Sequence, residues 1–157
     1  MICDVDTLAE KFPMVLKEKI KNRELIFPEE TKYEYNPILT YRAISREKDD
    51  FTEVTRADFK SYFELGKAPK KKPRGVKIEK IAEWYGVSSF LRKEIVEQKM
   101  SFPNPHKKMA VGYVTCEGGP QYTNLKEYHV CWWLFENADV SGYKIVEERE
   151  NGQGFMF

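Results

Sequence analysis

The segment 129–135, HVCWWLF, limits most strongly what this chain can fold into. Successive side chains of a strand point to opposite faces, and in this segment both faces are largely apolar. The two sets are Val130, Trp132 and Leu134 on one face and His129, Cys131, Trp133 and Phe135 on the other. This pattern is typical of an inner strand covered on both sides. We therefore expect a sheet that packs against further layers on both faces.

The chain has the length of one domain. Its 157 residues allow one core, and the 41% hydrophobic and 14% aromatic content predicts an ordered globule. The 26 basic and 25 acidic residues leave a formal net charge of +1. No global field therefore selects nucleic acid or an anionic membrane, and electrostatic specificity must be local.

The cysteines point to a reducing compartment. Cys3, Cys116 and Cys131 are too few for a disulfide framework and lack the Cys-x-x-Cys spacing of a zinc site. No stretch approaches the roughly 20 apolar residues of a membrane span. We expect a cytoplasmic protein with no metal site and no membrane contact, and the sequence assigns neither a cofactor nor an oligomeric state.

The periodic segments together predict an α+β fold. We expect a single compact domain over residues 1–157, with a mixed or mainly antiparallel sheet of about five strands and two to four helices. Pro13 divides the N-terminal helix into two pieces or bends it, because an internal proline costs about 3 kcal/mol. Thr55 and Asp58 form a capping pair that predicts a helix ending at Gly66. The clearest strand patterns lie at 38–44, 109–116, 129–135 and 143–147.

Residues 78–99 can be divided in two ways. They resemble a helix-turn-helix with Gly86 at the turn and Ser88 capping the second helix. Alternatively, a short strand or turn at 84–88 leads into one helix capped by Ser88. Arg92 falls where the first motif buries an apolar residue, so the second division is favoured.

Arg42 lies within the strand predicted at 38–44, among apolar neighbours. An unpaired buried charge would cost several kcal/mol, so this side chain needs a partner. Its stem can pack while its head reaches solvent or a structural carboxylate. Alternatively, Arg42 binds an anion at the floor of a cleft. Both interpretations stay open.

The basic loop 67–77, KAPKKKPRGVK, holds six basic residues and no acidic one. It is either a solvated loop or an arm that contacts phosphates with salt-dependent affinity. In the second case Lys70, Lys71, Lys72 and Arg74 would make the contacts, and the chain would be a nucleic-acid-binding module that also uses 78–99. No aromatic residue is interleaved for base stacking, which favours the solvated loop.

Two motifs, WYGVSSF at 84–90 and HVCWW at 129–133, resemble a set of small bacterial proteins. These proteins share a Trp-Gly-x-Ser turn and a His-x-x-Trp-Trp strand, and no function is assigned to them. The resemblance implies one domain from Tyr41 onward and implies no reaction.

The order of the polar residues resembles a reduced ADP-ribosyltransferase. Arg42 lies on an early strand, Ser88 and Ser89 lie mid-chain, and Glu148 and Glu150 lie near the end. In that superfamily the arginine and serine hold NAD and a glutamate stabilises the ribosyl cation. The resemblance implies a catalytic role for Glu150. The chain lacks the superfamily's Ser-Thr-Ser strand, and its acidic pair follows the last predicted strand.

The leading functional hypothesis is a cleft formed by Arg42, Ser88 and His129 that binds an anionic or nucleotide-like ligand. Nucleic-acid binding and a protein-interaction module with exposed aromatic residues are the alternatives. His129 and Cys131 lie about 6 to 7 Å apart on one strand, too far to form a catalytic pair directly. Whether the chain is an enzyme stays open.

Overall fold

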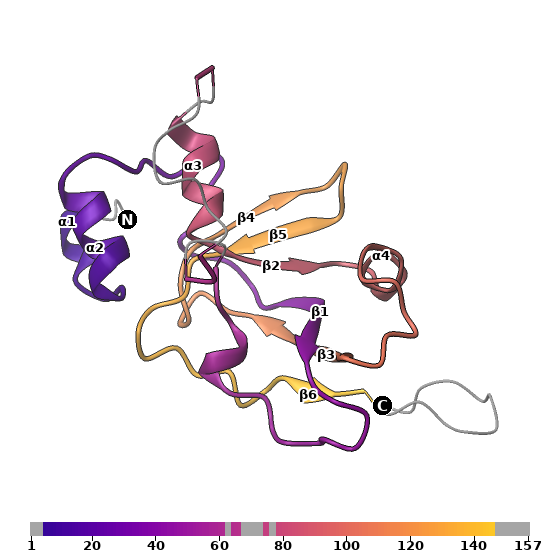
Figure 1. Ribbon diagram of the computed structural model, residues 1–157. Helices are drawn as coiled ribbons and strands as arrows, with labels where there is room; N and C mark the ends of the chain where they lie inside the picture. Colours follow the sequence, from indigo (N-terminus) through magenta and orange to yellow (C-terminus); the bar gives the residue numbers. More distant parts are fainter. Residues whose placement is uncertain (1–4, 62–63, 67–73, 76–77, 147–157) are drawn as a thin grey trace.

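The strands form one antiparallel sheet (Figure 1). The computed structural model describes residues 5–61, 64–66, 74, 75 and 78–146. Within them six strands follow the order β4-β5-β2-β1-β3-β6, and every pairing is antiparallel. The predicted α+β class is confirmed, with one strand more than expected. The strands are β1 (Ile38–Ser45), β2 (Val87–Phe90), β3 (Lys107–Val114), β4 (Gln121–Asn124), β5 (His129–Trp132) and β6 (Lys144–Ile145).

Four α-helices and one 3-10 turn are present in the described part of the chain. Pro13 separates the first two helices, as one of the two N-terminal alternatives predicted. None of these helices is long and apolar enough to cross a membrane. They are α1 (Val5–Ala9), α2 (Met14–Lys21), α3 (Ile78–Trp84) and α4 (Lys93–Lys99), and the 3-10 turn is η1 (Arg56–Asp58).

Strand β5 separates two layers, as its sequence predicts. The face that carries Val130 and Trp132, here called the loop face, packs against residues of the 46–61 and 134–143 segments. The face that carries Cys131, here called the helix face, packs against α1, α2 and α3 near one end and against α4 near the other. Figure 1 shows α1 and α2 well apart from α4, with the strands between them.

Three local predictions were wrong. Ser88 lies in strand β2 and caps no helix, because α4 begins only after Arg92. Residues 78–99 are therefore helix, strand and helix, which excludes a helix-turn-helix. Residues 121–124, which lie outside the predicted strand patterns, form β4 because their backbone pairs with β5. The helix expected after Thr55 is only the η1 turn, although the predicted capping box of Thr55 and Asp58 is present.

One glycine is required by a close backbone contact. Gly119 has a φ of +143°, and a Cβ built there would lie 1.9 Å from the carbonyl oxygen of Trp133. The turn before β4 thus brings its backbone against the chain that leaves β5. Tyr35 donates a hydrogen bond to the Gly119 carbonyl at 2.6 Å, and this contact fixes the same turn to the loop before β1.

Candidate functional site

Arg42 lies on the loop face and ties three segments together. Its Nε and Nη2 donate to the carbonyl oxygen of Asp58 at 3.3 and 3.1 Å, and its Nη1 donates to the carbonyl oxygen of Ser88. The guanidinium also lies over the ring of Phe59, 5.4 Å from its centroid. Burial lowers the pKa of Arg42 to about 10. The acceptors are main-chain carbonyl oxygens of this chain, and not the solvent or carboxylate that one interpretation of Arg42 expected.

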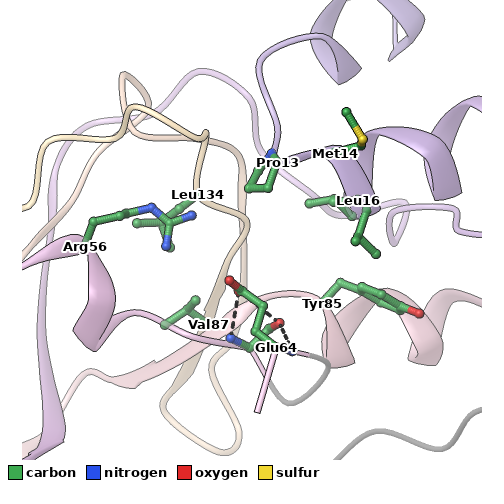
Figure 2. A pocket seen from close by; sticks show the side chains of 10 residues that line it. Pro13, Met14, Leu16, Arg56, Glu64, Tyr85, Val87 and Leu134 are labelled. Atoms are coloured by element: carbon green, nitrogen blue, oxygen red, sulfur yellow. Dashed lines mark hydrogen bonds between the residues drawn. The ribbon is translucent and has the colours of Figure 1, made fainter. Parts of the chain in front are cut away.

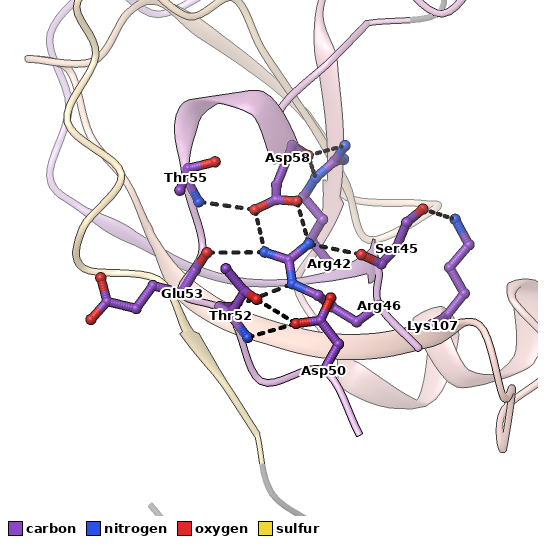
Figure 3. A network of polar contacts seen from close by, with 9 residues as sticks. All are labelled: Arg42, Ser45, Arg46, Asp50, Thr52, Glu53, Thr55, Asp58 and Lys107. Carbon is purple, nitrogen blue, oxygen red and sulfur yellow. Dashed lines mark hydrogen bonds and ion pairs between the residues drawn. The ribbon is translucent and has the colours of Figure 1, made fainter. Parts of the chain in front are cut away.

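Asp58 is the centre of the neighbouring polar network (Figure 3). Arg46 donates to both carboxylate oxygens at 2.7 and 2.8 Å, and the N–H of Thr55 donates at 2.9 Å. Burial acts to raise the pKa of Asp58, but the bonds from Arg46 and Thr55 outweigh it, and the pKa is lowered. Arg46 also donates to the carbonyl groups of Thr52 and Glu53. The network fixes the 46–58 loop onto β1.

Ser88 and His129 form a pair on the helix face. The Oγ of Ser88 and the Nε2 of His129 lie 2.9 Å apart, within hydrogen-bond distance. Tyr41 pairs with Phe90, and Phe90 pairs with His129, so these three side chains share one face.

The register places Arg42 and His129 on opposite faces. Arg42 follows Tyr41 in β1, so its side chain points away from His129. Ser88 links them only through two different atoms, its carbonyl oxygen to Arg42 and its hydroxyl to His129. The single cleft expected from Arg42, Ser88 and His129 is therefore not formed.

Other predicted site residues fall largely outside the described part of the chain. Glu150, Lys70, Lys71 and Lys72 lie in ranges that the structure does not describe, and Arg74 is exposed. The ADP-ribosyltransferase and nucleic-acid hypotheses stay predictions. Among the described residues, no group of three or more histidine, cysteine, aspartate or glutamate side chains could hold a metal ion.

A pocket lies where β2 begins and β5 ends, between α2, α3 and the segment that follows η1 (Figure 2). Its volume is about 170 Å³. Three polar side chains, those of Arg56, Ser61 and Glu64, interrupt an otherwise largely apolar lining. The remaining lining residues are Pro13, Met14, Val15, Leu16, Tyr85, Val87 and Leu134.

Arg56 lines this pocket with a guanidinium that has few hydrogen-bond acceptors among the described residues. Its Nη1 donates to the carbonyl oxygen of Phe59 at 2.8 Å, whereas its buried Nε has no acceptor among the described residues. Burial lowers the pKa of Arg56, and the charges of Glu64 and Glu136 act in the opposite direction. A guanidinium offers five N–H donors, and among the described residues Arg56 makes one hydrogen bond. A buried donor without an acceptor lowers the free energy of unfolding.

The first turn of α2 also lines the pocket and adds positive potential to it. Pro13 precedes the helix and provides no side-chain cap, and the first turn has no acidic residue. The N–H groups of Met14, Val15 and Leu16 have no acceptor among the described residues. Uncapped N–H groups and the helix dipole favour an anion at this end.

No sequence pattern could have predicted this pocket. Arg56 lies inside the Thr55–Asp58 capping pair, and that pair predicts a turn without indicating what packs against it. Residues distant in the sequence meet there only because of the sheet order; they are residues 13–16, Arg56, Ser61, Glu64, Tyr85, Val87 and Leu134.

The fold and the pocket define a small α+β domain with a site of ligand size. No protein-family model matches this chain. Neither the curated proteins nor the solved structures contain a match to it. The function must therefore be argued from the pocket.

Proposed function

We propose that this protein binds a small organic anion, a carboxylate with a compact apolar tail, in the pocket beside Arg56. The proposal keeps the anionic ligand expected from the sequence but moves it from Arg42 to Arg56. Arg42 uses three N–H groups on carbonyl oxygens of this chain, whereas Arg56 uses one. The unmet hydrogen-bonding capacity of Arg56 is the observation that carries the proposal.

A carboxylate suits the polar end of the pocket. Its two oxygens match the fork of a guanidinium, and charge-assisted bonds of this kind are about twice as strong as neutral ones. The uncapped first turn of α2 favours negative charge as well. A bound carboxylate would thus accept hydrogen bonds from the terminal N–H groups of Arg56, which among the described residues bond only to the Phe59 carbonyl.

The apolar walls set the size of the tail. Leu16, Val87 and Leu134 contribute apolar side chains to the lining of the pocket. An engineered apolar cavity of about 150 Å³ accepts benzene, so about 170 Å³ suits a tail of roughly four to six carbons. For a ligand of about eight heavy atoms, roughly 0.6 kcal/mol per atom gives a Kd on the order of 0.1 to 1 mM.

Calorimetric titration with 4-methylpentanoate tests the proposal, and 4-methylpentanamide serves as the neutral ligand of equal shape. We expect the acid to bind at least tenfold more tightly than the amide. Arg56→Gln should weaken the acid at least tenfold, because it removes the charge and keeps a polar side chain. Arg74→Gln, the same change at an exposed arginine that does not line the pocket, should leave binding unaltered. Equal binding of acid and amide, or no binding at 10 mM, would overturn the proposal.

A further inference from the structure

We infer that the ligand is an α-amino acid with an apolar side chain, and that Glu64 binds its ammonium group. The inference rests on the proposed function, because the carboxylate of the same ligand would occupy the site beside Arg56. It adds a second charged group to the ligand and a second charged residue to the site. Arg56 and Glu64 both line the pocket, and Figure 2 shows both side chains at it.

The carboxylate of Glu64 is held in place by a short reciprocal turn. The N–H and Oγ of Ser61 donate to its Oε1 at 3.1 and 3.2 Å, and the N–H of Glu64 donates to the Oγ of Ser61 at 3.2 Å. Ser61 is itself buried. The second oxygen, Oε2, has no donor among the described residues. A carboxylate fixed in this way keeps one acceptor oxygen for a ligand.

Arg56 and Glu64 face the pocket without closing on each other. The charge of Glu64 acts on Arg56, yet no ion pair joins these two described residues. The guanidinium of Arg56 and the carboxylate of Glu64 thus attract each other but are not in direct contact. An α-amino acid carries a carboxylate and an ammonium on one carbon, so it can span such a gap with both charges paired.

Glu64 is the acidic group available for this role. Glu136 also acts on Arg56 electrostatically, but it does not line the pocket. The apolar walls then receive the side chain of the amino acid, and the estimated tail length fits leucine or a residue of similar size. A glutamate set against an arginine across an apolar pocket thus matches the three parts of such a ligand.

Calorimetric titrations with L-leucine and two analogues that each lack one charged group test the inference. These ligands are L-leucine, 4-methylpentanoate, which lacks the amino group, and 3-methylbutylamine, which lacks the carboxylate. We expect L-leucine to bind at least tenfold more tightly than either of the others. In Glu64→Gln, the affinity for L-leucine should fall to that for 4-methylpentanoate, whose own affinity should stay unchanged. The Oε1 of glutamine can still accept the bonds from Ser61, so this variant keeps the turn.

The outcomes separate the inference from the proposed function. If 4-methylpentanoate binds as tightly as L-leucine and Glu64→Gln changes neither, the amino-acid inference fails and carboxylate binding stands. If L-leucine and 4-methylpentanoate both fail to bind at 10 mM, the proposed function fails as well. If L-leucine binds more tightly but Glu64→Gln has no effect, Glu64 is not the ammonium partner and the inference fails.

Discussion

Replacing Arg42 by methionine tests whether this side chain is a structural tie. Methionine keeps the apolar stem in contact with Phe59 but removes three hydrogen bonds from a buried charged group. At roughly 1.5 kcal/mol per bond the loss would be about 4.5 kcal/mol. Relief of the burial cost of the charge offsets part of it, so we expect a net loss of about 3 kcal/mol. For a domain of this size that lowers the Tm by roughly 6 to 12 °C.

Urea unfolding followed by tryptophan fluorescence measures this loss, because Trp132 and Trp133 are almost completely buried. We expect a lower midpoint with an unchanged slope, which marks a change in stability alone. Arg74→Met, the same change at an exposed position, should stay within about 0.5 kcal/mol of the wild type. A loss below about 1 kcal/mol in Arg42→Met would refute the structural role and reopen a ligand role for Arg42.

Three further changes have defined outcomes. Arg56→Met should alter the unfolding free energy in urea by less than about 1 kcal/mol, because it removes one hydrogen bond together with an unmet buried donor; a loss above 2 kcal/mol would make Arg56 structural. Asp58→Asn should lose roughly 1 to 3 kcal/mol at pH 7. Because the pKa of Asp58 is lowered in the folded state, its carboxylate stabilises the fold above about pH 4, and this stabilisation is lost as the pH falls further. The unfolding free energies of the wild type and Asp58→Asn, measured against pH, should therefore converge in acid. A constant difference between them would contradict this. Gly119→Ala should cost more than about 3 kcal/mol or prevent folding, because its Cβ meets backbone, whereas Gly142→Ala, which has open space, should be near neutral in thermal melts.

Features fixed by local chemistry could be predicted from the sequence. The apolar alternation of 129–135 predicted a strand, of which β5 forms the first four residues, and it predicted an apolar layer on each face. Pro13 predicted either a break or a bend, of which the break is observed, and the Thr55–Asp58 pair predicted a capping box. Each of these depends on residues adjacent or nearly adjacent in the chain, so a short pattern contains the needed information.

Features that depend on distant pairing could not be predicted in this way. Ser88 suits both a helix cap and a strand, and only its pairing with Cys131 decides between them. The mostly polar residues 121–124 become a strand because β5 offers them a partner. Whether Arg42 and His129 lie on the same face of the sheet depends on the register of three strands. That register cannot be predicted from the sequence of any one of the strands.

The central claim is that the guanidinium of Arg56 binds an anion in the pocket. The most direct test is to follow the Nε–H resonance of Arg56 by ¹H–¹⁵N NMR, assigned with Arg56→Lys, during titration with 4-methylpentanoate. We predict a saturable shift of this resonance at a Kd on the order of 0.1 to 1 mM, with the Nε–H resonance of Arg42 unchanged. A resonance of Arg56 that stays in place up to 10 mM ligand would contradict the account.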